Sequence, residues 1–204
     1  MKREDAYNLM CEMVQSPNLR RHGLAVEAIM KSLCSHLRVR ESRDPSAPPQ
    51  DDKWWNEQFN QEEWGVVGML HDADYEIIGK DLEKHTLVTA EKLRSLGVSE
   101  RIIEGIRAHH WGVKPTRDNI MEKAVFCADD TSGLITACAL IMPDKKLASV
   151  KIDSVVKKFK NPSFAAGAKR EQIASCETDL GISLEEFLGI ALKAMQEISQ
   201  ELGL

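Results

Sequence analysis

The sequence predicts an all-α protein. Apolar residues recur three and four positions apart along most of the chain, helix-capping residues stand where these patterns begin, and the apolar–polar alternation of strands is nearly absent. With 204 residues, of which 43% are hydrophobic and 29% charged, the chain is long enough to bury a substantial core. We expect one domain over residues 1–204, with its core at about 19–142 and a helical C-terminal extension, 143–204, packed on it.

The first elements are separated by breaking residues. A short helix pattern over Glu4–Val14 stops at a Ser-Pro-Asn turn, and Asn18 is the expected N-cap of an amphipathic helix over Leu19–Leu37. Residues 39–60 hold three prolines and many charges, which predicts a loop or insert whose order the sequence does not determine. Two tryptophans inside it, Trp54 and Trp55, either pin the loop to the core or form a lid.

The later helices are recognised by their boundaries. A segment that is apolar almost all round predicts a buried helix, and Gly or Asn/Ser positions mark the ends of the others. The expected helices are Glu62–Asp72, 84–96 ending at Gly97, 100–111 capped by Ser99, Ile120–Ile141 opened by Asn119, and a last helix through 187–202 that starts at the capping-box spacing of Ser183 and Glu186.

Net charge, hydrophobic runs and cysteine spacing argue against several classes of protein. The net charge of −5 argues against a nucleic-acid-binding protein, and no apolar run approaches the roughly 20 residues that span a bilayer. The five cysteines are scattered without a CxxC, and the N-terminal residues lack a signal-peptide core, so reduced thiols and a cytoplasmic location are expected. Phosphate-binding GxxxxGK[ST] and GxGxxG motifs are absent from the sequence.

Histidines and aspartates interrupt several apolar helices. His71-Asp72 ends the buried helix in "GVVGMLHDADYE", and further polar groups stand in other helices at His22, His85, His109-His110 and Asp129. An ionised carboxylate is costly to bury unless it is paired or binds a metal. Imidazoles and carboxylates suit one or two ions of Mn, Fe, Co, Ni or Zn, with Mg as a further option. On residue types alone, a buried polar network without a metal is the alternative.

The order His22 … His71-Asp72 … Asp129 resembles the HD superfamily of metal-dependent phosphohydrolases. The additional His85 and His109 look like the six-ligand, two-metal branch of that superfamily. The likeness covers most of the chain, in the segments "RRHGLAVEAIMKSL", "WGVVGMLHDADYE", "EKHTLVTAEKL", "IIEGIRAHH", "EKAVFCADDTSGLITACAL" and "KKFKNPSFAAGAKREQI", and is closest to small single-domain predicted HD hydrolases. It implies an HD-domain helical bundle with a metal site between helices.

The resemblance also implies roles. His22, His71, Asp72 and Asp129 match the core metal ligands, Asp72 as the bridge if two metals bind, and His85 and His109 match the added ligands. His110 is the second choice to His109, because adjacent helix positions point about 100° apart. The implied reaction is hydrolysis of a phosphate ester, either a nucleotide or a related small phosphorylated molecule, with metal-bound hydroxide as nucleophile.

One departure from the family pattern follows the His-Asp pair. Many relatives have Ile-Gly-Lys there, whereas this chain has Ala73-Asp74-Tyr75, so the lysine that would meet a substrate phosphate is missing. Asp74 is a catalytic candidate beside Asp72, or else orients a ligand or caps a helix. The departure leaves the substrate class open.

Cations for a phosphate are sought in two places. Residues 145–170 hold eight basic residues and one acidic residue, a net charge of +7, so the rest of the chain must carry a net charge of −12. This basic segment either attracts an anionic substrate or is a solvated face. The phosphate-binding candidates are Arg21, Arg107, Lys145, Lys169 and Arg170. Within the basic segment, "NPSFAAGAKR" is a candidate loop over the mouth of the site.

Three functions follow from these observations. The first is a phosphohydrolase acting on a small phosphorylated substrate, with no nucleic acid or membrane as partner. The second is a regulatory module that binds a metal or nucleotide with little turnover, which the missing lysine favours. The third is a di-iron oxygenase, since a similar six-ligand arrangement serves oxygen chemistry in some HD relatives. Substrate, physiological metal, the number of metals and oligomeric state are not determined by the sequence.

Overall fold

The computed structural model describes residues 1–42, 53–79 and 81–204, without the side chain of Trp54, and over these ranges it is all-helical, as predicted. No strand occurs in the described ranges, where a single 3₁₀ turn, Leu147–Ser149, accompanies the α-helices. The α-helices are α1 (Arg3–Met13), α2 (Pro17–Glu41), α3 (Lys53–Gln58), α4 (Gln61–Leu70), α5 (Leu87–Ser95), α6 (Glu100–Ala108), α7 (Ile120–Leu140), α8 (Ile152–Phe159), α9 (Arg170–Ala174), α10 (Cys176–Asp179), α11 (Leu184–Glu197) and α12 (Ser199–Leu202).

The helix starts follow the predicted caps with one exception. Asn119 and Ser183 cap α7 and α11 as expected, each side chain accepting the N–H of the residue three positions later. Asn18 was the wrong choice for α2: Ser16 is its N-cap and accepts the Leu19 N–H at 3.3 Å. Pro17 then occupies the first helical turn, where a missing N–H costs nothing, so the helix starts before Asn18. Ser99 stands at the N-cap of α6 but makes no side-chain capping bond.

Several predicted elements differ in extent. The helix expected over 100–111 ends at Ala108, and the helix expected through 187–202 is divided at Ile198 into α11 and α12. The helix expected over 84–96 begins only at Leu87, because Thr86 adopts a left-handed backbone with φ of +69°. The 39–60 insert is partly helical, since α2 continues to Glu41 and α3 covers Lys53–Gln58; residues 43–52 lie outside the described residues. Trp55 is buried against Phe59, with ring centroids 5.0 Å apart, so it pins this segment to the core. The Trp54 side chain lies outside what is described.

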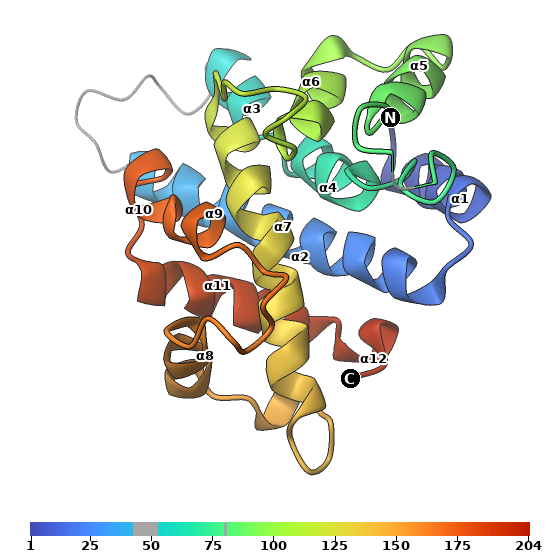
Figure 1. Cartoon of the computed structure of the whole chain (residues 1–204). Helices are drawn as coiled ribbons and strands as arrows, with labels where there is room; N and C mark the ends of the chain where they lie inside the picture. The colour runs from blue at the N-terminus through green and yellow to red at the C-terminus, as the bar shows by residue number, and fades with distance from the viewer. Residues whose placement is uncertain (43–52, 80) are drawn as a thin grey trace.

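The long helix α2 is the centre of the bundle. It packs against α4, α7 and α11, and α7 in turn packs against α6 and α9. In Figure 1, α7 crosses α2, with α4, α5 and α6 toward one end of α7 and α8, α11 and α12 toward the other. Residues from all of these longer helices join one hydrophobic core, in which Ile29, Leu33, Trp64 and Phe187 are fully buried.

Two glycines let α2 and α4 approach closely. A Cβ on Gly68 would lie 2.8 Å from the carbonyl of Val26, and a Cβ on Gly23 would lie 2.7 Å from the carbonyl of Met69. Only glycine fits at either position without moving a backbone. His22 precedes Gly23 in the sequence, and His71 stands at the end of α4, so both histidines lie beside this close contact. The crossing of the two helices therefore positions the first part of the site.

Candidate metal centre

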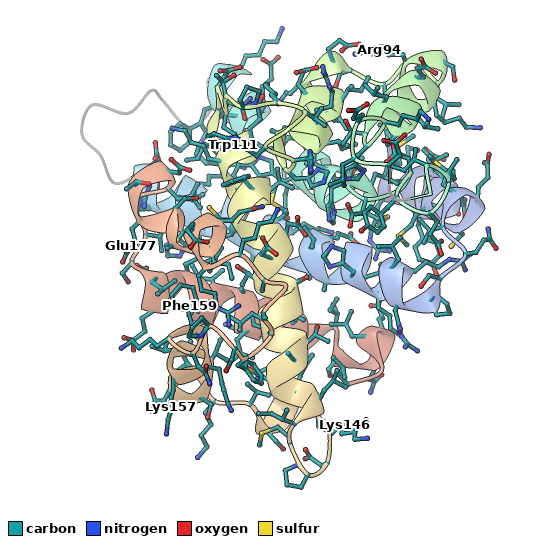
Figure 2. All side chains as sticks on the ribbon, in the orientation of Figure 1. Arg94, Trp111, Lys146, Lys157, Phe159 and Glu177 are labelled. Carbon is teal, nitrogen blue, oxygen red and sulfur yellow. The ribbon has the colours of Figure 1, made fainter. Side chains whose placement is uncertain are left out.

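The six side chains predicted as ligands come together between the helices. His22 lies in α2, Asp129 lies in the middle of α7, and the others stand at helix ends or in turns. His71 and His109 are the C-cap residues of α4 and α6, Asp72 follows His71, and His85 precedes α5. Buried or half-buried His and Asp groups at this position can hold a metal ion. Figure 2 shows side chains filling the space between α4, α7 and α2.

The first half of the centre contains two histidines from different helices. The Nε2 atoms of His22 and His71 lie 2.9 Å apart. Asp129 Oδ1 is 3.2 Å from His22 Nε2 and 3.5 Å from His71 Nε2. Asp72 Oδ2 completes the group at 3.6 Å and 3.7 Å from the same two nitrogens.

The second half repeats this arrangement with another histidine pair. The Nε2 atoms of His85 and His109 lie 2.9 Å apart. Asp72 Oδ1 is 3.2 Å from His85 Nε2 and 3.5 Å from His109 Nε2. The two oxygens of one carboxylate therefore face two separate histidine pairs. Within the described part of the chain, two groups of side chains have ligand atoms close enough together to hold a metal ion. The first group is His22, His71 and Asp72, and the second is Asp72, His85 and His109.

The Nδ1 atoms of all four histidines are held by acceptors. His71 and His109 each donate to the carbonyl three residues earlier, Gly68 at 2.8 Å and Ile106 at 2.6 Å, which are carbonyls left free at the end of a helix. His85 donates to Asp74 Oδ1 at 2.9 Å. His22 donates to Ser132 Oγ at 2.8 Å, because the Ser132 hydroxyl itself donates to the Asp129 carbonyl.

These hydrogen bonds decide whether the residues fit a metal. With each Nδ1 protonated, each neutral imidazole presents a lone pair at Nε2, and two lone pairs 2.9 Å apart repel one another. A proton or a metal cation between them removes the repulsion. Histidine ligands in metalloproteins show this pattern, with the second ring nitrogen held by a carbonyl, hydroxyl or carboxylate. The donor set therefore fits transition-metal ions, which bind imidazole and carboxylate together.

The pKa shifts show how strongly the centre favours positive charge. Burial lowers the pKa of His71, but the negative charges of Asp72 and Asp129 outweigh burial and raise that pKa to about 9. For His85, burial is likewise outweighed by Asp72 and Asp74, and the pKa rises to about 9. Burial raises the pKa of Asp72, yet the surrounding histidines bring it well below its ordinary value. The two Asp72 and Asp129 carboxylates thus stay ionised and attract cations.

Asp74 supports the centre from behind His85. Its carboxylate is fully buried and accepts three hydrogen bonds, from His85 Nδ1, from the Thr86 N–H at 3.0 Å and from the Thr89 N–H at 3.1 Å. Burial would raise the pKa of Asp74, and these bonds lower it. With both oxygens engaged away from solvent, we interpret Asp74 as a positioning residue, in place of the predicted catalytic role. The same bonds hold Thr86 in its left-handed conformation.

His110 lies beside the ligand set. Its ring centroid is 5.3 Å from that of His85 and 6.1 Å from that of His109. It belongs to neither metal-binding group, whereas His109 belongs to the second. Burial and the neighbouring histidines lower the pKa of His110, so it is neutral near pH 7. The geometry favours His109 as the ligand, in line with the sequence preference.

The cationic candidates separate into two sets. Lys169 lies close to the centre, where its charge acts on Asp130 and His110, and Arg21 lines a cavity together with His22. Arg107 is instead paired with Glu104 at 2.7 Å. Lys145 lies beyond the end of α7, and the eleven residues from Asp129 to Leu140 rise about 16 Å. Figure 2 labels its neighbour Lys146 at the far end of α7 from Trp111.

Arg170 is a structural residue. Its guanidinium fills the inside of the loop before α9 and donates to the backbone carbonyls of Lys158, Phe159, Asn161, Phe164, Ala165 and Ala168. With its donors used in this way, it is not available to a phosphate, so we interpret Arg170 as structural, whereas phosphate binding by Arg107 or Lys145 stays a prediction. Sequence spacing does not reveal which cations are already paired.

The centre opens to solvent on one side. The side chains of His71, His85 and His109 are at most 3% exposed, whereas those of His22, Asp72 and Asp129 are 22–23% exposed. A cavity of about 310 Å³ adjoins His22 and Asp129, and Ala165, Gly167 and Ala168 also line it. These three belong to the "NPSFAAGAKR" segment, which lies at the mouth of the centre as expected.

Comparison with known proteins identifies no relative: no protein-family model, curated protein or solved structure matches the chain. All five cysteines are free thiols, in agreement with the sequence expectation. None of the helices in the described ranges has the length and apolar character to cross a membrane. Ser132, whose hydroxyl accepts from His22, was not anticipated, because a serine inside an apolar helix gives no local sign of its partner.

Proposed function

We propose that this protein is a metal-dependent phosphohydrolase of the HD superfamily, acting on a small phosphate ester with two divalent cations bound. The observation that carries the proposal is the placement of Asp72, whose Oδ2 faces the His22–His71 pair and whose Oδ1 faces the His85–His109 pair. A carboxylate shared in this way is suited to bridge two cations. His22, His71, Asp129 and Asp72 would hold one of them, and Asp72, His85 and His109 the other.

Two cations at such a site lower the pKa of a bound water toward neutrality and offset the negative charge of the phosphoryl oxygens. The chain contributes the rest. Hydrogen bonds that the histidine Nδ1–H groups donate to Gly68, Ile106, Asp74 and Ser132 fix the ring orientations, so that little reorganisation accompanies binding.

The open face of the centre suits an anionic substrate. Asp130 lines this cavity, and burial beside the negative Asp129 raises its pKa to about 6. Lys169 lies close enough for its positive charge to oppose that rise. In the absence of the family's lysine after the His-Asp pair, Lys169 is the cation of this chain that we place nearest a bound phosphate.

The test begins with metal content. Protein purified without chelator is expected to contain about two transition-metal ions per chain by elemental mass spectrometry. With that metal present, phosphate release is then measured over a panel of phosphomonoesters and phosphodiesters. Asp72→Ala is expected to abolish turnover and to bind at most one metal. Asp153→Ala removes an exposed carboxylate of α8 and is the matched control.

The alternatives give different results in the same test. Two metals without turnover of any ester would favour a regulatory module. Oxygen consumption by an iron-loaded protein, without phosphate release, would favour an oxygenase. Absence of any bound metal, even after incubation with Mn²⁺ or Fe²⁺, would refute the proposal and leave the histidine pairs as a buried polar network.

A further inference from the structure

A second cavity adjoins the metal centre through Gly133. This cavity measures about 420 Å³ and lies between α2, α7 and the segment that follows α11. His22 and Gly133 line both this cavity and the one beside Asp129. A ligand held at the metal centre therefore reaches the second cavity by passing over Gly133.

Gly133 leaves this passage open. It stands inside α7, one turn after Asp129, where a glycine destabilises a helix by about 1 kcal/mol relative to alanine. A Cβ built on Gly133 meets no atom within 4 Å, in contrast to Gly23 and Gly68, where packing excludes one. A larger side chain at position 133 would project into free space at the junction of the two cavities and would obstruct a ligand there.

The walls of the second cavity are aliphatic. Ala25, Leu140, Leu202 and Leu204 line it, with Thr136 beside them. Its lining holds no Phe, Tyr or Trp, and the one ring among the lining side chains is the imidazole of His22, which belongs to the metal centre. Contact with methylene groups is the interaction that such walls provide.

The cavity also contains a cation. Arg21 lines it and donates to Asn18 Oδ1 at 3.4 Å, which is a weak bond. Among the described residues, no carboxylate lies within salt-bridge distance of its guanidinium, in contrast to the paired Arg94 and Arg101. An anionic group on a ligand would supply the missing partner.

From these observations we infer that the leaving group of the substrate is an aliphatic chain that passes over Gly133 and carries an anionic group opposite Arg21. The inference rests on the proposed phosphohydrolase function and narrows its substrate class from nucleotides to phosphate esters of aliphatic alcohols. Gly133 is then the residue that determines specificity, and the anion is a carboxylate or a second phosphate.

The experiment compares four esters on the metal-loaded protein: methyl phosphate, hexyl phosphate, phosphorylated ω-hydroxyhexanoate and adenosine monophosphate. For the wild type, kcat/KM for hexyl phosphate is expected to exceed that for methyl phosphate by at least ~100-fold, since each methylene in an apolar pocket adds about tenfold or more. The carboxylated ester is expected to be hydrolysed faster still, and adenosine monophosphate more slowly than either long ester.

Two variants locate the effect. Gly133→Leu is expected to lower the hexyl-to-methyl ratio of kcat/KM by at least ~10-fold, whereas Gly189→Leu, at another helix-interior glycine with open space that lines neither cavity, leaves that ratio unchanged. Arg21→Ala is expected to remove the advantage of the carboxylated ester over hexyl phosphate. Binding of hexylphosphonate and methylphosphonate, measured by calorimetry, gives the same comparison without turnover.

The outcomes separate the two proposals. Equal kcat/KM for methyl and hexyl phosphate, or faster hydrolysis of adenosine monophosphate, overturns the aliphatic subsite and leaves the phosphohydrolase intact. Tight, Gly133-dependent binding of hexylphosphonate without hydrolysis of any ester supports the subsite and refutes the enzyme. A Gly133→Leu variant with the wild-type hexyl-to-methyl ratio overturns the role of Gly133.

Discussion

Replacement of Asp74 by asparagine tests how the second half of the metal centre is supported. The carboxylate accepts two N–H groups at Oδ1, from His85 Nδ1 and Thr86, and a third at Oδ2, from Thr89. Asparagine has the same shape but only one oxygen, so its NH₂ group must face at least one of these donors. One buried, charge-assisted hydrogen bond is lost and one donor is left without an acceptor.

The magnitude follows from that count. Loss of such a bond with an unsatisfied donor costs about 2–3 kcal/mol. For a chain of this size each kcal/mol lowers Tm by about 2–4 °C, so the expected decrease is about 5–10 °C. Affinity for the metal between His85 and His109 is expected to fall about 10–100-fold, because His85 loses the carboxylate that orients it, while the site at His22, His71 and Asp129 retains its affinity.

The assay combines urea unfolding with calorimetric metal titration. Asp144→Asn is the control, since Asp144 accepts hydrogen bonds from Lys146 and Ser149 in an exposed loop after α7. Because the folded-state pKa of Asp74 is lowered, its stabilisation is present above the unfolded pKa and is lost as pH falls, so the difference between the Asp74 variant and the wild type should shrink in acid. Wild-type affinity at both metal sites of the variant would refute this role.

The remaining predictions concern the ligands, the loop and pH. His109→Ala should lose one metal per chain, whereas His110→Ala should keep both; the reverse result would exchange their roles. Arg170→Ala should destabilise the protein by about 2–3 kcal/mol and speed amide exchange over residues 159–168. An unaltered Tm would show that the loop keeps its conformation without the arginine. In metal-free protein, the raised pKa values of His71 and His85 add stability that is full below pH ~6.5 and declines as pH rises toward about 9. With metal bound, stability should instead rise with pH, because protons compete with the metal for the histidine nitrogens. Urea unfolding at several pH values, with and without metal, measures both trends.

Much of the fold was predictable because it depends on local chemistry. Helix periodicity and caps such as Asn119 and Ser183 act within a few residues, so the sequence indicates them directly. Two differences have other causes: Pro17 starts α2 directly after its N-cap Ser16, and the left-handed Thr86 is held by the buried carboxylate of Asp74, which is distant in sequence.

The candidate site divides in the same way. The cost of burying imidazoles and carboxylates without a partner drew attention to several of these groups. The resemblance to the HD superfamily then implied the ligand set His22, His71, Asp72, His85, His109 and Asp129. The supporting residues were not predicted, since the hydroxyl of Ser132 is ordinary until the fold brings His22 against it. The cationic candidates are the opposite case, because their sequence context did not show that they already have partners. In the structure, Arg170 donates to backbone carbonyls and Arg107 pairs with Glu104.

The sequence by itself therefore determined that the chain is all-helical, and it singled out the side chains that come together in the candidate metal centre. Tertiary structure decided how they are divided: one Asp72 carboxylate between two histidine pairs, with Asp74 behind one of them and Ser132 behind the other. The physical reason is the distance along the chain over which each effect acts. Helix propensity and the cost of burying charge are properties of short segments, whereas the distance between two Nε2 atoms depends on how closely whole helices cross, and glycines at Gly23 and Gly68 set that distance for α2 and α4.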